Sequence, residues 1–243
     1  KKGFVWLVGA GPGNPELLTL KAVKCIEEAD VILHDALANN VYKPFISTNC
    51  NLVYVGKRSG CHSTTQKEIN EMLVAYAEEG KNVVRLKGGD PLIYARAAEE
   101  IKALKDNNIP FGIVPGISSF NAGCASVGFP ATQREVARQV MLIDGHTCLR
   151  EDADWSWVKS FQGMISIFMG KNNLQAIAKR LIKEGVSAEW QVVAVEDAGT
   201  SKASFNAKKL RDIALKGFTF QSEGPGIIYI AKHIENYLQK GLT

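Results

Sequence analysis

Val84-Arg-Leu-Lys-Gly-Gly-Asp-Pro-Leu-Ile93 is the stretch that decides how the fold is interpreted. It begins as an apolar run that predicts the end of a buried strand. Gly88 and Gly89 then remove two side chains where the strand leaves the sheet, so a ligand could lie against bare backbone. Asp90 adds a carboxylate, and Pro91 stiffens the exit. Because ligands of open α/β sheets gather at the carboxyl ends of strands, this stretch is a candidate binding loop; an ordinary turn is the alternative.

Short apolar runs alternate with helical patterns through the first half of the chain. Thr65 and Glu68 form a capping-box pattern before the clearest helix, and Asn14 followed by Pro15 predicts the start of an earlier one. Alternating strands and helices predict a parallel sheet with right-handed crossovers. The predicted strands are Phe4–Val8, Val31–His34, Leu52–Val55, Asn82–Leu86 and Phe111–Val114.

The pattern restarts in the second half, after a segment rich in small residues. A helical stripe over 174–182 lies between two of four further predicted strands. We therefore predict two α/β domains, residues 1–117 and residues 118–243, with a ligand cleft between them. The four strands are Val140–Ile143, Ile165–Met169, Gln191–Val195 and Gly226–Ile230.

The composition is that of a globular protein. Apolar residues make up 46% of the chain and charged residues 22%, and the net charge is +4. We expect neither a nucleic-acid partner nor a membrane span, because the chain has no arginine-rich face and no sufficiently long apolar run. The five cysteines lack paired spacing, which indicates reduced thiols in a cytoplasmic protein. Cys61-His62 and His146-x-Cys148 are too isolated to predict a metal site.

A glycine-rich turn follows the first predicted strand and superficially resembles a dinucleotide-binding loop. The third glycine of G-x-G-x-x-G would fall at Asn14, and Pro12 removes an N–H that could bind a phosphate. These two departures disfavour a nicotinamide site.

Four stretches together resemble the tetrapyrrole methylases, and most closely the uroporphyrinogen III C-methyltransferase branch of that family. They occur in the family's order, and the resemblance spans most of residues 4–231. The four are Val8-Gly-Ala-Gly-Pro-Gly-Asn-Pro-Glu-Leu-Leu-Thr-Leu20, Val55-Gly-Lys-Arg-Ser-Gly-Cys-His62, Val84-Arg-Leu-Lys-Gly-Gly-Asp-Pro91 and Val114-Pro-Gly-Ile117.

The resemblance implies an N-terminal Rossmann-like parallel sheet and a C-terminal mixed-sheet domain, in a cytoplasmic homodimer. It implies that S-adenosylmethionine binds in the cleft and leaves as S-adenosylhomocysteine. The implied reaction is transfer of two methyl groups to ring carbons of uroporphyrinogen III, which gives precorrin-2 for siroheme and cobalamin. The sulfonium already activates the methyl group, so no metal is expected.

The resemblance also assigns the acid–base residues. It implies that Asp35 accepts a proton and that Lys57 is the candidate donor. Both follow predicted strands, where such groups could reach a substrate. Without the resemblance, the residues by themselves favour a strand-terminal turn aspartate and a solvated lysine over acid–base roles.

The resemblance also implies which residues contact the cofactor. They include glycines that allow close approach, hydroxyl groups that could form hydrogen bonds, and apolar side chains that could enclose the adenine or the methionine chain. Met169 has an alternative interpretation as a core residue at the end of an apolar strand. Counting along the chain puts Ala198 at the family's adenine-site glycine, with Gly199 one residue later, and either could fill the role. The predicted contacts are Pro12, Gly88, Gly89, Asp90, Ile93, Ser118, Ser119, Met169 and Ala198.

An acidic tetrapyrrole requires cationic partners. The candidates for substrate binding are Arg58, Arg96 and Arg134, with Arg138 nearby, and each could instead be a solvated surface residue.

The family pattern is less well kept on the substrate side. Ala36 stands where the family usually has arginine, and Gln133 stands where it has histidine. The family's Gly-Arg-Gly-Gly becomes Ala95-Arg96-Ala97-Ala98. We interpret these changes as an adapted substrate pocket. A methyltransferase for another tetrapyrrole and a catalytically silent binding protein remain alternatives.

Overall fold

A computed structural model describes residues 1–38, 40–56 and 64–238 of the chain. The chain forms two compact units, unit 1 (Lys1–Ser119) and unit 2 (Phe120–Thr243). Each unit contains one five-stranded sheet. This is the predicted α/β class, with one parallel and one mixed sheet.

The sheet of unit 1 has the strand order β3-β2-β4-β1-β5, and all neighbouring strands are parallel. The order places β4 between β1 and β2, so the carboxyl ends of these three strands lie beside one another. All five strands predicted for this half are present. Their bounds are β1 Phe4–Gly9, β2 Val31–His34, β3 Asn51–Tyr54, β4 Asn82–Lys87 and β5 Phe111–Val114.

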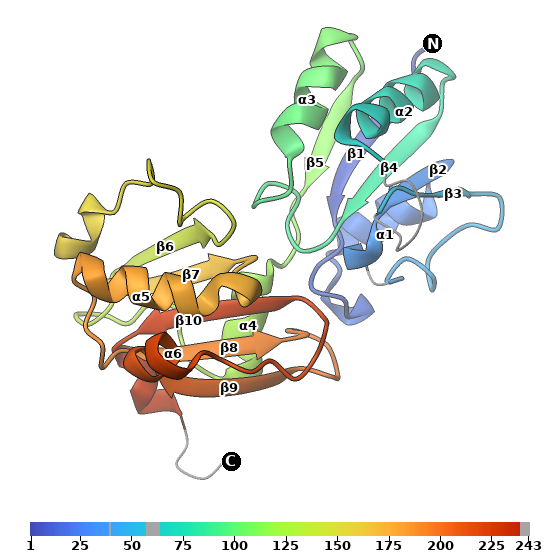
Figure 1. Cartoon of the computed structure of the whole chain (residues 1–243). Helices are drawn as coiled ribbons and strands as arrows, with labels where there is room; N and C mark the ends of the chain where they lie inside the picture. Colours follow the sequence, from blue (N-terminus) through green and yellow to red (C-terminus); the bar gives the residue numbers. More distant parts are fainter. Residues whose placement is uncertain (39, 57–63, 239–243) are drawn as a thin grey trace. The chain divides into compact units, whose positions relative to one another are not determined.

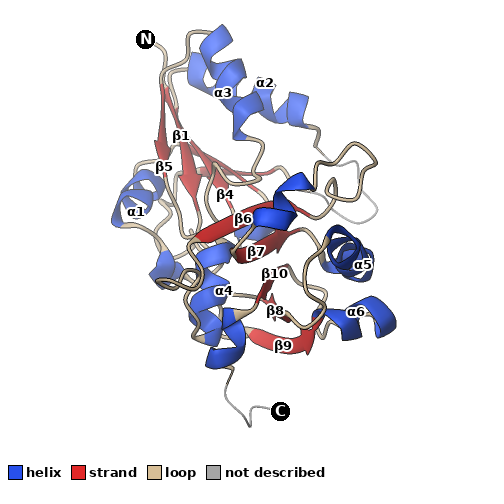
Figure 2. Cartoon of the chain, turned by 90° about the vertical axis from the view of Figure 1, so that its left-hand side faces the viewer, coloured by secondary structure: helices blue, strands red, loops and turns tan. Residues whose placement is uncertain are grey.

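Helices cover both faces of the unit 1 sheet (Figure 2). Helix α1 (Leu20–Glu27) packs on one face, and α2 (Gln66–Glu78) and α3 (Ala97–Asp106) pack on the other. Successive strand residues point to opposite faces, so Ile32 joins the α1 core while Leu33 joins the α2 and α3 core. Both cores are built mainly from buried aliphatic side chains.

The capping predictions have different outcomes. The capping box is confirmed, because Thr65 Oγ1 accepts from Glu68 N and the Glu68 carboxylate accepts from Thr65 N. The helix predicted at Asn14 is wrong. Asn14 caps only a short 3-10 turn, Pro15–Leu17, and the chain is extended before Thr19 caps α1. The apolar spacing suggested one helix, but Asn14 and Thr19 each cap a separate one.

Unit 2 has a mixed sheet of order β6-β7-β10-β8-β9. Strands β6 and β7 are parallel, and β10 is antiparallel to both of its neighbours. Helices α5 and α6 cover one face, and α4 lies on the other, where Tyr229 Oη donates to the Phe120 carbonyl (Figure 1). The strands are β6 Gln139–Asp144, β7 Gly163–Phe168, β8 Gln191–Glu196, β9 Ser204–Lys209 and β10 Gly226–Ala231, and the helices are α4 Ser119–Val127, α5 Leu174–Glu184 and α6 Leu210–Lys216.

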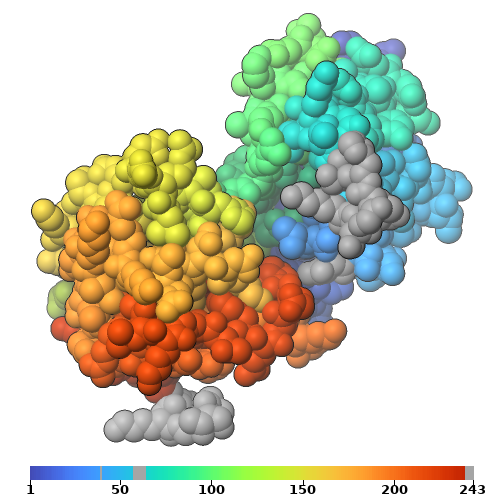
Figure 3. Space-filling view, viewed as in Figure 1, coloured from blue at the N-terminus to red at the C-terminus, as the bar shows by residue number. Residues whose placement is uncertain are grey.

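The segment between β6 and β7 forms the yellow surface of unit 2 in Figure 3. It contains the 3-10 helix Ser156–Ser160 and buries Trp155 against α5, where the Arg180 guanidinium lies 5.6 Å from the Trp155 ring. Further 3-10 helices are Ala36–Ala38, Lys171–Asn173 and His233–Tyr237.

Strand β9 was not predicted from the sequence. Its residues, Ser-Phe-Asn-Ala-Lys-Lys, are mostly polar and only partly buried, because β9 is an edge strand paired with β8 alone. Its strand conformation depends on pairing with β8, which is buried and mostly apolar, and not on an apolar pattern of its own.

Among the residues that the model describes, no helix is both long and apolar enough to span a bilayer.

Two cysteines are predicted to react slowly with alkylating agents. Burial raises the pKa of the thiols of Cys124 and Cys148 from 9.0 to about 11. At a pH of about 9, roughly 1% of each thiol is then ionised in the folded protein, against about half in the unfolded chain. We expect iodoacetamide to modify both at least about tenfold faster in concentrated guanidinium chloride, measured by peptide mass spectrometry. Equal rates in the two solvents would contradict this.

Candidate active site

Three loops of unit 1 meet at the carboxyl edge of its sheet, after β1, β4 and β5. The first two are joined by paired hydrogen bonds: Gly11 N donates to Gly89 O at 3.2 Å, and Gly89 N donates to Gly11 O at 2.7 Å. The second and third are joined by Gly116 N, which donates to Asp90 Oδ2 at 3.0 Å. The sheet order therefore assembles, at one edge, loops that are distant in sequence.

The two glycines after β4 have different surroundings. A Cβ on Gly88 would lie 2.5 Å from Leu37 Cβ, so Leu37 fills the space that the missing side chain leaves. The expectation of bare backbone is therefore wrong at Gly88. Gly89 has a φ of +68°, and the nearest atoms to a Cβ there are Ser118 Cα and Ser119 N, both at 3.8 Å. Gly89 thus leaves an open backbone surface beside Ser118 and Ser119.

Asp90 has a structural role in the loop. Its Oδ1 accepts from Leu92 N at 2.8 Å, and its Oδ2 accepts from Gly116 N at 3.0 Å. The first bond closes a turn within the loop after β4, and the second holds that loop against the loop after β5. A contact between Asp90 and a cofactor stays a prediction.

The remaining predicted cofactor contacts are divided between the units. Pro12 and Ile93 are half-buried and Ser118 is buried, all in unit 1. Met169 and Ala198 are in unit 2, after β7 and β8, whose carboxyl ends lie at the same edge of that sheet because both strands are antiparallel to β10.

Met169 is not a core residue. It is 41% exposed and has a φ of +54°, an uncommon conformation for a residue with a side chain. The core interpretation of Met169 is therefore wrong. Ala198 is buried, between Asp197 (φ +50°) and Gly199 (φ +75°), and Gly199 N donates to Ser126 Oγ at 3.1 Å. Strained backbone of this kind occurs often at ligand sites, and it follows both β7 and β8 here.

Asp35 lies directly after β2. Its Oδ1 accepts from Leu37 N at 3.0 Å, and its Oδ2 accepts from Arg85 Nη2 at 3.3 Å. The side chain is 25% exposed. The carboxylate is held at both oxygens and still reaches the surface, as a proton acceptor must. Lys57 and Arg58 lie outside the described residues.

A buried ion cluster behind Asp35 was not predicted. Arg85 and Lys87 on β4 point to the α3 face, where Glu100 lies in the first turn of that helix. Glu100 Oε1 lies 3.1 Å from Arg85 Nε, and Glu100 Oε2 lies 2.6 Å from Lys87 Nζ. Burial is the main cause that lowers the pKa of Lys87 below 10.5. The available signal was two cations at alternate positions of a strand that is otherwise apolar.

The predicted substrate arginines within the described residues lie on the surface. Arg96 precedes α3 with a φ of +56°, and its Nη2 lies 2.6 Å from Glu99 Oε1. The hydrogen bond from Arg96 lowers the pKa of Glu99. Arg134 and Arg138 are exposed in unit 2; Arg134 lies within the turn closed by Gln133 and Ala137, and Arg138 directly follows that turn. Substrate binding by these arginines stays a prediction.

No three His, Cys, Asp or Glu side chains come together as a possible metal site within residues 1–38, 40–56 and 64–238.

Comparison with known proteins adds a family match. The model of the tetrapyrrole (corrin/porphyrin) methylases matches residues 5–214. The uroporphyrinogen-III C-methyltransferase of Methanocaldococcus jannaschii is 40% identical over 232 residues, which cover 95% of this chain and 96% of that protein. Siroheme synthase 2 of Cronobacter sakazakii is 38% identical over 231 residues, but the chain spans only 50% of its length.

A solved structure has the same fold. The uroporphyrin-III C-methyltransferase of Thermus thermophilus, crystallised with S-adenosylhomocysteine, is 32% identical, with a TM-score of 0.80. The likeness covers 97% of this chain and 100% of that one.

Proposed function

The chain belongs to the tetrapyrrole (corrin/porphyrin) methylase family, and from this membership we propose that it is an S-adenosylmethionine-dependent uroporphyrinogen-III C-methyltransferase. The observation that carries the proposal is the likeness over nearly the whole of both chains to the Methanocaldococcus jannaschii enzyme of that name. The Thermus thermophilus structure, similar over its whole length, supports the same methyl donor.

The residues of unit 1 fit the donor. Gly89 leaves open backbone beside Ser118 and Ser119, where a Cβ would occupy the space. We propose that this surface, with Pro12 and Ile93, contacts S-adenosylmethionine, and that Gly88 and Asp90 contribute by shaping the loop. Contacts from Met169 and Ala198 stay predictions.

The chemistry requires a base at the macrocycle. S-adenosylmethionine supplies a methyl group that its sulfonium already activates. When a ring carbon forms the new C–C bond, the C–S bond breaks, its electron pair stays on sulfur, and the ring carries the positive charge. Removing one ring proton restores neutrality. We propose that Asp35 accepts this proton, because its carboxylate is both oriented and partly exposed. The Lys57 donor role also remains a proposal.

The decisive experiment is anaerobic turnover. Incubation with uroporphyrinogen III and S-adenosylmethionine is expected to give precorrin-2, which carries two new methyl groups and, because a proton is lost with each transfer, is heavier by two CH2 units in mass spectrometry. Added S-adenosylhomocysteine should suppress the reaction. Methyl transfer to a precorrin but not to uroporphyrinogen III would show that the substrate is a different tetrapyrrole. Donor binding without transfer to either compound would favour a catalytically silent binding protein. The second of these alternatives is weakened by the presence of Asp35.

From the family resemblance we further propose that the protein works as a homodimer in the cytoplasm.

A further inference from the structure

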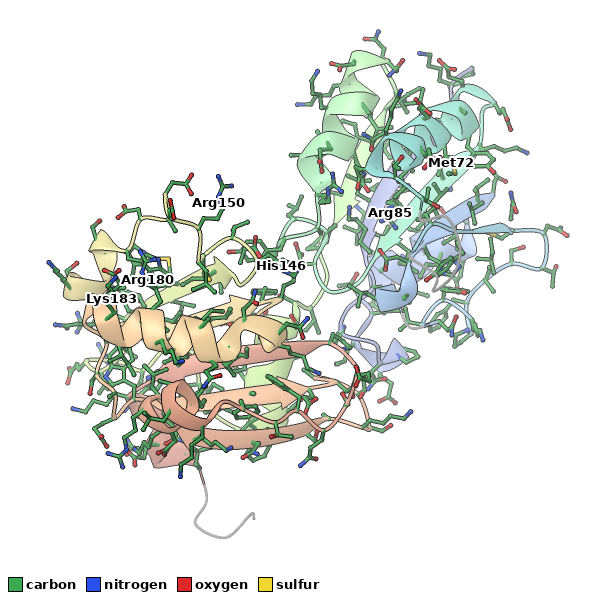
Figure 4. The ribbon with its side chains drawn as sticks, viewed as in Figure 1. Met72, Arg85, His146, Arg150, Arg180 and Lys183 are labelled. Carbon is green, nitrogen blue, oxygen red and sulfur yellow. The ribbon has the colours of Figure 1, made fainter. Side chains whose placement is uncertain are left out.

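Three charged side chains are buried in unit 1 behind the Asp35 carboxylate. Arg85 is 5% exposed, Lys87 is 3% exposed and Glu100 is 0% exposed. Burying charge is unfavourable unless the charges are paired, so a buried cluster of this size calls for an explanation. Arg85 is labelled on β4 in Figure 4.

Every nitrogen of the Arg85 guanidinium has a partner. Nε donates to Glu100 Oε1 at 3.1 Å, Nη1 donates to the carbonyls of Leu86 at 3.1 Å and Leu33 at 3.5 Å, and Nη2 donates to Asp35 Oδ2 at 3.3 Å. A planar guanidinium held at three corners has a fixed orientation. Its Nη2 is therefore a fixed donor directed at Asp35.

Glu100 holds the rest of the cluster. Besides Arg85, its carboxylate accepts from Lys87 Nζ at 2.6 Å and from Gln66 Nε2 at 3.3 Å. The two basic side chains, Arg85 and Lys87, are thus paired with two carboxyl groups, Glu100 and Asp35. Asp35 is the one member of the four with substantial exposure, at 25% against 6% or less for the others.

We propose that Arg85 is a positioning residue for methyl transfer, which acts through Asp35 by holding its carboxylate in a fixed orientation, and that Glu100 fixes Arg85 in this role. The inference rests on the proposed function. Leu37 N binds Oδ1 and Arg85 binds Oδ2, so rotation of the carboxylate breaks at least one hydrogen bond. The outer lone pairs then stay toward the exposed side, where a ring proton arrives.

A double-mutant cycle tests whether Arg85 acts through Asp35. Arg85→Met should lower kcat on the order of 100-fold, since small misplacement of a reacting group has effects of that size. The KM for S-adenosylmethionine should change less than about twofold, because Arg85 contacts no proposed donor-binding residue. Arg85→Lys, which keeps the cation, should recover part of kcat. In the Asp35→Asn background, Arg85→Met should change kcat less than about twofold further.

The controls separate this inference from its premise. Arg150→Met removes an exposed arginine, paired with Asp152 at 3.0 Å in unit 2, and should leave kcat unchanged. Thermal unfolding of each variant shows which ones are folded at the assay temperature, and if Arg85→Met is not, Arg85→Lys takes its place in the cycle. Equal losses of kcat in the wild-type and Asp35→Asn backgrounds would show a merely structural role. Wild-type protein that fails to methylate uroporphyrinogen III would instead overturn the proposed function.

Discussion

Asp35→Asn is expected to lower kcat by about 10²- to 10⁴-fold, the usual contribution of a general base. The amide has the shape of the carboxylate and still offers Leu37 N an oxygen, but it does not accept a proton at neutral pH. The KM for S-adenosylmethionine should be nearly unchanged, because the proposed donor surface lies at Gly89 and Ser118. Steady-state kinetics with uroporphyrinogen III, with the product weighed, measures the effect.

A matched control is Asp106→Asn. Asp106 is an exposed aspartate at the end of α3, 2.6 Å from Lys102, and the same chemical change there should leave kcat unaltered. If Asp35→Asn retains wild-type kcat, Asp35 has no part in proton transfer, although the protein could still be a methyltransferase with another base.

Glu100→Leu is expected to have the largest effect on stability, a loss of about 3–5 kcal/mol in the free energy of unfolding. Glu100 is fully buried and is the nearest anion to both Arg85 and Lys87. Removing it leaves two buried cations with Asp35 alone. Urea denaturation followed by circular dichroism measures the change. Glu71→Gln, in an exposed pair with Lys67, should change stability by less than about 0.5 kcal/mol.

The stability lost in Glu100→Leu should depend on pH, because Lys87 titrates differently in the folded and unfolded protein. Burial already lowers the pKa of Lys87 below 10.5, and loss of Glu100 removes a partner that raises it. Between the folded pKa and 10.5 the unfolded chain binds more protons than the folded one, so stability rises with pH in that interval. The difference in the free energy of unfolding between wild type and Glu100→Leu should therefore become smaller as the pH approaches 10.5. The double variant Lys87→Met/Glu100→Leu should be more stable than Glu100→Leu, since it removes one charge of each sign. If this stability difference does not change with pH, and if adding Lys87→Met does not reduce it, then the loss comes from packing and not from unpaired charge.

Local patterns predicted much of the fold. The capping box at Thr65 depends on residues three apart, and the five strands of unit 1 are short apolar runs between turns. Patterns of this kind failed at two places. Asn14 caps only a 3-10 turn because Thr19 caps α1 separately, and the half-polar β9 is a strand because β8 pairs with it.

In the candidate site, too, local patterns predicted some features and missed others. The stretch from Gly88 to Asp90 was predicted to end a strand in a loop, and it does. Its surroundings differ from the prediction, since Leu37 fills the space at Gly88 and backbone N–H groups bind both oxygens of Asp90. Leu37 and Gly116 come from other loops, whose positions the local sequence does not specify.

The sequence by itself determined the α/β class, the strands other than β9 and the family, because these depend on residue patterns along the chain. Only the tertiary structure decided that Asp35, Arg85 and Glu100 form one cluster. Asp35 and Arg85 are 50 residues apart, and they meet because β4 pairs with β2 in a register that sets Leu33 opposite Arg85. Strand order and register are properties of the assembled sheet, so no local pattern could have shown which charge lies behind the proposed base.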